Sequence, residues 1–89
     1  MMGERKEKNM QKNKYLGSYM GYLEFRTFYR MRFLFLDYAT EFLRTIKRDY
    51  PQYFESNTER VYVIGRFVYF PKSMITEEEL KAIEKKYLF

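Results

Sequence analysis

The sequence has no cysteine and no histidine, and both absences narrow the function. Without cysteine no disulfide can form, so we expect a protein of a reducing compartment, the cytoplasm. Without histidine the chain lacks an imidazole base, an imidazole metal ligand and any Ser-His or Cys-His pair. We therefore predict a protein that is not an enzyme and that holds no metal and no cofactor.

Long apolar runs are also absent. The longest such run, Phe33–Leu36, is far shorter than the roughly 20 residues that a membrane-spanning helix needs. The N-terminus has no apolar segment of the kind found in secretion signals. The glycines, of which there are only four, fit neither a GxGxxG nor a GxxxxGK pattern. We expect a soluble protein with no membrane partner and no phosphate-binding loop.

Aromatic residues are abundant, with ten Tyr and nine Phe in 89 residues. Each aromatic side chain buries roughly 150–250 Å². Such large buried areas help one small domain to form a sufficient core. The formal net charge is +5. Residues 1–14 contain five basic and two acidic residues, so they carry +3 and leave +2 for residues 15–89.

The charge distribution divides the chain into two parts. Residues 1–14 have almost no apolar side chains to bury, and we predict a flexible basic arm there. Residues 15–89 form the single predicted domain. The arm is either attracted to a polyanion or serves only as a solvated tail.

A tight β-hairpin is predicted around Gly65-Arg66. The flanking runs, residues 61–64 and 67–70, are β-branched or aromatic throughout. A two-residue type II′ turn takes glycine at its first central position, and Pro71 lacks the N–H needed to continue the second strand. Arg66 is then directed into solvent. The hairpin either covers a small core or forms a wing that touches nucleic acid.

Residues 15–36 fit two periods. Spacings of three and four indicate a helical face, whereas the alternation of apolar residues with arginines indicates a half-buried strand. We predict a helix over residues 15–30 and a short strand over residues 32–36. Arg26 and Arg30 share a face with tyrosines, a mixture that binds phosphates and stacks on bases. The alternative is that the arginine stems only cover apolar surface.

A second helix is predicted from Tyr38 to Asp49. Asp37 is its expected N-cap, and Pro51 restricts Tyr50 and so ends it. Its expected inward stripe consists of Ala39, Phe42, Leu43 and Ile46. The outward cations, Arg44, Lys47 and Arg48, either meet phosphate or only offset the negative helix end.

The remaining segments have clear local signals. Residues 52–60 read as a turn-rich linker. Thr76 and Glu79 have the spacing of a capping box. The final helix that they open has an apolar side made of Leu80, Ile83, Tyr87 and Leu88.

The predicted element order is helix, short strand, helical segment, two-stranded hairpin, helix. With LDYATEFL at residues 36–43 and IGRFVYFPKS at residues 64–73, the chain resembles the small winged-helix domains of the excisionase and MerR-like group over about half its length. This resemblance implies an α+β fold, helices packed on a short β-hairpin with a short additional strand, and DNA binding. Because Pro51 interrupts the expected recognition helix, the residues favour phosphate and single-strand contacts over base reading in the major groove.

The first function hypothesis is a small nucleic-acid-binding protein without enzymatic activity. It would be a DNA-binding or accessory subunit of a mobile-element or phage replication or recombination system, with single- or double-stranded DNA and a larger replication or recombination enzyme as partners. The candidate contact residues, all cationic, are Arg66, Lys47, Arg48, Arg44, Lys72, Arg60 and Arg30.

The second hypothesis is a protein-interaction adaptor or inhibitor with little DNA binding of its own. It rests on the many Tyr, Phe, Met and Arg residues, since these types are enriched in interface cores. A homo-oligomer is left open by the same composition.

Overall fold

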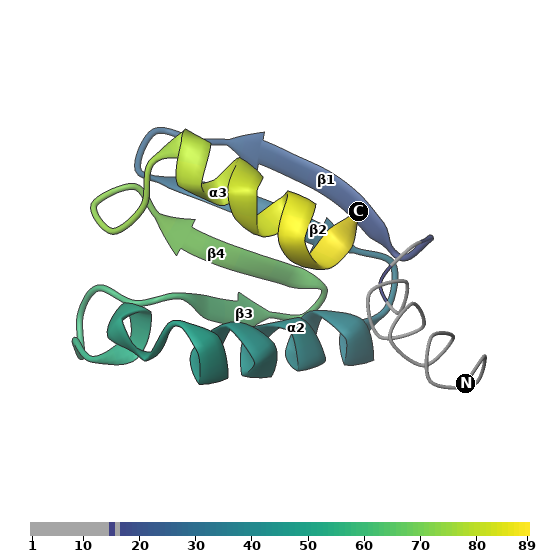
Figure 1. The fold of residues 1–89 in the computed structure, drawn as a ribbon, viewed down its shortest axis with the longest axis horizontal. Helices are drawn as coiled ribbons and strands as arrows, with labels where there is room; N and C mark the ends of the chain where they lie inside the picture. Colours follow the sequence, from purple (N-terminus) through teal and green to yellow (C-terminus); the bar gives the residue numbers. More distant parts are fainter. Residues whose placement is uncertain (1–14, 16) are drawn as a thin grey trace, which may run out of the picture.

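The computed structural model describes Tyr15 and residues 17–89, in which each of two β-hairpins is followed by a helix (Figure 1). The elements are β1 (Tyr19–Glu24), β2 (Phe28–Phe33), α2 (Leu36–Asp49), the 3-10 helix η1 (Pro51–Phe54), β3 (Tyr62–Ile64), β4 (Phe67–Pro71), α3 (Glu77–Ile83) and the π-helical turn η2 (Glu84–Leu88). The predicted α+β class is confirmed. The predicted basic arm at residues 1–14 lies outside the described residues.

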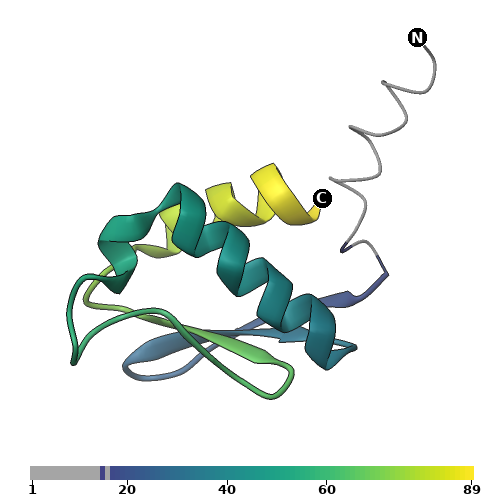
Figure 2. The ribbon, with the colours of Figure 1, turned by 90° about the horizontal axis from the view of Figure 1, so that it is seen from below.

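The four strands form one antiparallel sheet in the order β1-β2-β4-β3. The second strands of the two hairpins, β2 and β4, pair at its centre. Both helices lie on the same side of the sheet (Figure 2). The helices therefore pack on two joined hairpins rather than on one hairpin and one additional strand.

The core lies between the sheet and this helix layer. Its largest fully buried side chains come from both layers and include Phe33, Phe42, Phe70 and Met31. Burying one such side chain contributes roughly 1.5–3 kcal/mol. No helix in the described part of the chain is long and apolar enough to cross a membrane.

The predictions for residues 15–36 were wrong. The segment expected to be a helix over residues 15–30 contains β1, a turn and the start of β2. The strand expected over residues 32–36 ends at Phe33, because Leu34 and Phe35 lead into α2.

A β-bulge in β1 is the physical reason for this error. Between two regular pairs of the ladder, Met20 and Gly21 together oppose the single residue Arg32. The extra residue directs both Tyr19 and Tyr22 to the helix side, where their hydroxyl groups donate to carboxylates of the C-terminal helical segment. A spacing of three in a strand therefore imitates the helical period. Gly21 has a φ of 93°, which favours glycine.

The hairpin predicted around Gly65-Arg66 is confirmed. Strands β3 and β4 flank these two residues, and Gly65 has the positive φ, 61°, that the predicted turn requires. Strand β4 ends at Pro71, as expected from the missing N–H of proline.

Helix α2 confirms the predicted C-terminal boundary but corrects the N-terminal one. The helix starts at Leu36 with Phe35 at the N-cap, and no side chain of a described residue caps it. Asp37 is therefore a first-turn residue, where its charge offsets the positive helix end, and not the N-cap. The expected inward residues Ala39, Phe42 and Ile46 are buried.

The capping box and the buried apolar side predicted for the C-terminal helix are confirmed. The Thr76 side chain accepts from the backbone of Glu79, and the Glu79 side chain accepts from the backbone of Thr76. Its inward residues Leu80, Ile83 and Leu88 are buried. The linker predicted over residues 52–60 is irregular only in part, because its first residues belong to η1.

Candidate nucleic-acid interface on the open sheet face

The two faces of the sheet differ because alternate residues of each strand point to opposite sides. On β2 and β4 the residues that face the helices, such as Tyr29, Met31 and Val68, are buried. The residues between them are less buried, and strand alternation directs their side chains away from the helix layer. Figure 2 shows that both helices lie on the other side of the sheet. We call this side the open face; its members are Met20, Leu23, Phe25, Phe28, Arg30, Arg32, Tyr62, Ile64, Phe67 and Tyr69.

Aromatic rings on the open face contact one another across the strands. Tyr62 pairs with Tyr69 in the ladder, and their rings are stacked at 4.8 Å with an interplanar angle of 5°. Phe28 lies 5.3 Å from the Tyr69 ring and 4.9 Å from the Phe25 ring. The result is a continuous aromatic surface that extends from the β1–β2 turn to the edge strand β3.

Arg30 lies between two rings of this surface. Its guanidinium carbon is 4.3 Å from the centre of the Phe67 ring and 4.9 Å from that of Phe25. Each such contact contributes roughly 0.5–2 kcal/mol. Among the described residues no carboxylate forms an ion pair with Arg30. Its Nε is buried, and no group in the described part of the chain accepts a hydrogen bond from it. A buried donor without an acceptor costs about 1–3 kcal/mol.

Arg32, two residues along the same strand, lies on the same face and is exposed. Together with Arg30 it borders a shallow depression of about 150 Å³. The other side of the depression is formed by β1 at the bulge, with Met20, Gly21 and Leu23. The bulge thus forms one wall of this depression, and two cations lie at its border.

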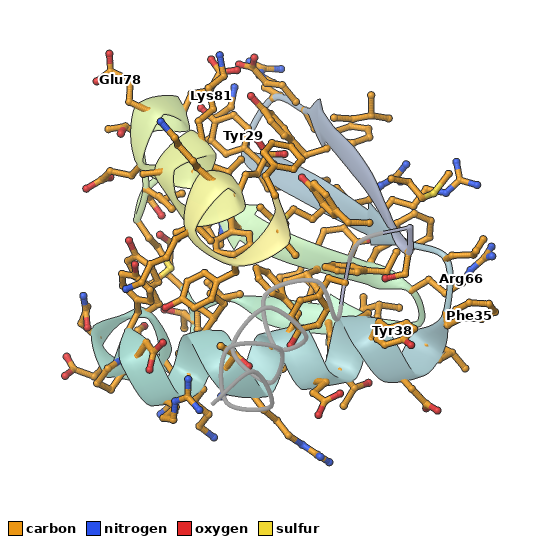
Figure 3. The ribbon with its side chains drawn as sticks, turned by 45° about the vertical axis from the view of Figure 1, so that its right-hand side comes forward. Tyr29, Phe35, Tyr38, Arg66, Glu78 and Lys81 are labelled. Atoms are coloured by element: carbon orange, nitrogen blue, oxygen red, sulfur yellow. The ribbon has the colours of Figure 1, made fainter. Side chains whose placement is uncertain are left out.

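The predicted contact residues lie on different surfaces. Arg30 belongs to the open face, and Arg66 is exposed in the β3–β4 turn. The backbone carbonyl of Arg66 accepts from the amide of Phe33 at 2.9 Å. Figure 3 shows Arg66 at the same end of the molecule as Phe35, away from Lys81 on α3. Arg66 is thus placed at one end of the central strands.

The predicted cations of α2 lie in the helix layer, apart from the open face. Arg44 and Lys47 are exposed, and Arg48 pairs with Asp49 at 2.9 Å. Lys72 is bound to Glu24 at 2.5 Å, and Arg60 is exposed in the loop before β3. The structure therefore does not bring the seven predicted residues together.

Sequence reasoning missed most of the open face. Arg32, Phe67, Tyr69 and Tyr62 were not among the candidates, although the alternation of arginine and apolar residues over 25–35 was a signal for the β2 part. The pairing of β2 with β4 joins residues about forty positions apart, and no local pattern contains that information.

Tyrosine–carboxylate pairs on the opposite side attach the C-terminal helical segment to β1. Tyr19 donates to Glu84, which is only 7% exposed, and Tyr22 donates to Glu77 at 2.7 Å. Burial, followed by the bond to the carboxylate, raises the pKa of both phenols well above the usual value. These tyrosines remain neutral and stabilise the packing of the two layers.

A third pair joins the two helical segments at the end of α2. Tyr87 donates to Asp49. The bond from Arg48, and then that from Tyr87, lowers the pKa of Asp49 to about 2. In the described part of the chain no cluster of three or more acidic residues could hold a metal ion.

Comparisons with protein-family models, with curated proteins and with solved structures found no match for this chain.

Proposed function

We propose that this protein binds single-stranded nucleic acid on the open face of its sheet. The observation that carries the proposal is Arg30, a guanidinium group stacked between two aromatic rings on an uncovered face without an anionic partner among the described residues. Such a cation attracts the phosphate backbone, and the adjacent rings offer stacking surfaces for bases.

The aromatic surface favours single strands over duplexes. Bases can stack on protein rings only when their own faces are free, and a duplex covers those faces by stacking base on base. A four-stranded sheet with exposed aromatics accommodates two or three unstacked bases in known RNA-binding modules. The Tyr62–Tyr69 pair and Phe28 offer aromatic rings for such stacking here.

The winged-helix resemblance also implies binding of nucleic acid, but on a different surface of the protein. That arrangement uses Arg66 as the wing residue and the α2 cations, including Arg44 and Lys47, on phosphates. A role as DNA-binding or accessory subunit in a mobile-element or phage replication or recombination system is compatible with either surface. Because α2 lies in the helix layer, mutations can separate the two surfaces.

The test measures binding of labelled single- and double-stranded DNA by fluorescence anisotropy over a series of salt concentrations. Tyr62→Ala should weaken single-strand binding by roughly 5- to 150-fold, since stacking on one base contributes about 1–3 kcal/mol. Phe89→Ala is the matched control, because Phe89 is 62% exposed but contacts Tyr19 on the helix side. It should leave binding unchanged.

The outcomes decide between the surfaces. Loss of binding in Tyr62→Ala with normal binding in Arg44→Gln supports the open face. The opposite pattern, with a preference for duplex DNA, supports the winged-helix arrangement and refutes our proposal. Absence of binding by the unmodified protein even at low salt excludes nucleic acid as the partner.

A protein partner is the second candidate function. Exposed apolar side chains near the start of α2 and the β3–β4 turn favour it, because Phe35, Leu36 and Ile64 are each more than half exposed. An adaptor that uses this surface would lose its partner, but not nucleic-acid binding, in Phe35→Ser.

A further inference from the structure

The depression beside the β1 bulge has a chemistry of its own within the open face. Arg30 and Arg32 are two residues apart on β2, so their Cα atoms are separated by about 6.6–6.8 Å along the strand and their side chains point to the same side. Neither forms an ion pair with a described residue. Two neighbouring cations thus border one depression, and the described residues that line it include no carboxylate.

The wall of the depression allows close approach to the backbone. Gly21 has no side chain, and a Cβ at this position would meet no atom of the described residues within 4 Å. A small ligand group can therefore reach the backbone of β1 at the bulge, as often occurs where glycine lines a binding site. The volume of about 150 Å³ suits a small group rather than a whole nucleotide.

We propose that this depression binds one phosphate group of the nucleic-acid strand, an inference that rests on the proposed function. Arginine suits phosphate because its planar set of N–H donors matches two phosphate oxygens at once. The Nε of Arg30 is buried and has no acceptor among the described residues, so the protein leaves one donor of this guanidinium group unpaired beside the depression.

The position of this phosphate predicts the path of the strand. Arg30 is opposite Tyr69 in the ladder, and Tyr69 is opposite Tyr62. With a phosphate held beside β1 and bases stacked on these tyrosines, the nucleic-acid chain crosses the sheet from β1 towards β3. It then runs roughly perpendicular to the β-strands. The phosphate bound in the depression then determines which bases of the nucleic acid reach the tyrosine rings.

The experiment compares the salt dependence of oligothymidylate binding by the unmodified protein, Arg32→Gln and Lys81→Gln. Arg32 is exposed, so its replacement should leave the fold intact, which circular dichroism verifies. Loss of one phosphate contact should lower the slope of log K against log salt by about 0.7. Lys81, on α3 (Figure 3), is a charge-matched control that should leave the slope unchanged.

A second comparison identifies the ligand group. An oligothymidylate with neutral methylphosphonate linkages should bind the unmodified protein and Arg32→Gln equally, because the charge that Arg32 recognises has been removed. Arg30→Lys, which keeps the charge but loses the planar donor set, should bind the ordinary oligonucleotide more weakly than the unmodified protein.

The possible failures can be distinguished. Unchanged salt dependence in Arg32→Gln, combined with weakened binding in Tyr62→Ala, overturns the phosphate site but keeps the proposed function. An equal loss of slope in Lys81→Gln also overturns the site, because the charge effect would then be unspecific. If the unmodified protein does not bind the oligonucleotide, both proposals fail.

Discussion

Removing the hydroxyl group of Tyr19 tests how the C-terminal helical segment is held against β1. This hydroxyl donates to Glu84, whose carboxylate is 7% exposed. In Tyr19→Phe the buried carboxylate loses this donor, while the ring keeps its packing 5.3 Å from Phe33. An unsatisfied buried group costs about 1–3 kcal/mol. We expect the free energy of unfolding to fall by about that amount, and Tm by roughly 4–8 °C per kcal/mol.

Urea unfolding of a double-mutant cycle measures this interaction. Glu84→Gln keeps an acceptor for the tyrosine but removes the charge, so Tyr19→Phe should cost less in that background, with a coupling of about 0.5–3 kcal/mol. Tyr62→Phe is the control, because no described residue accepts from its hydroxyl; its effect should stay within about 0.5 kcal/mol. Additive single mutants, or a Tyr19→Phe protein as stable as the unmodified one, would refute the reasoning.

The same pair predicts an alkaline limit to stability. Burial, and then the bond to Glu84, raises the pKa of Tyr19 above its ordinary value of 10.0. Above pH 10 the unfolded chain releases this phenolic proton and the folded chain does not, so stability falls as the pH rises. Below pH 10 the contribution is fully present. The decline should be shallower in Tyr19→Phe, as measured by urea unfolding between neutral and alkaline pH.

Three further changes have defined outcomes in urea unfolding. Gly65→Ala should lower the free energy of unfolding by about 1–2 kcal/mol because of the positive φ; among the described atoms the new Cβ meets only Leu36, at an ordinary 3.9 Å. Gly65→Asn should lower it less, because Asn tolerates this conformation. Equal losses in the two variants would contradict this explanation. Thr76→Ala should cost about 0.5–2 kcal/mol through loss of the cap, whereas Thr76→Ser should be nearly neutral. The pKa of Asp49 is lowered to about 2, chiefly by Arg48. Asp49 therefore stabilises the fold above its ordinary pKa of 3.8, and this stabilisation is lost as the pH falls towards 2. Because the pair is exposed, the loss of unfolding free energy on acidification should be smaller in Asp49→Asn than in the unmodified protein by less than about 1 kcal/mol.

Elements with local signals could be predicted from the sequence. The turn at Gly65 depends on one residue with positive φ, and the cap at Thr76 on two residues three positions apart. The end of α2 depends on Pro51. In each case the interacting groups are neighbours in the chain, so their identities alone contain the information.

The errors arose where structure depends on distant or irregular contacts. The bulge at Met20 and Gly21 changes the side-chain period of β1 from two to three, so a helix and a bulged strand have the same pattern. No side chain of a described residue caps the start of α2. Asp37 was misplaced because the N-cap is usually a short polar residue whose side chain accepts from the first turn. The open face was not predicted because it requires the pairing of β2 with β4.

The candidate site was predictable in its residue types but not in its position. The sequence indicated arginines mixed with aromatics, and Arg30 is where such a mixture occurs. The cations of α2 were equally plausible from the sequence, because exposed cations near a helix end look the same whether they meet solvent or phosphate. Only the layer arrangement separates the two groups.

The bulge in β1 also affects how the sheet meets other chains. Edge strands with regular unpaired N–H and C=O groups act as templates for aggregation, and proteins often interrupt them with bulges or keep them short. In the described sheet one edge, β1, contains the bulge, and the other edge, β3, has only three residues. Both edges of the described sheet are therefore poor templates for strand addition, so its aromatic-rich open face does not adjoin a long, regular edge.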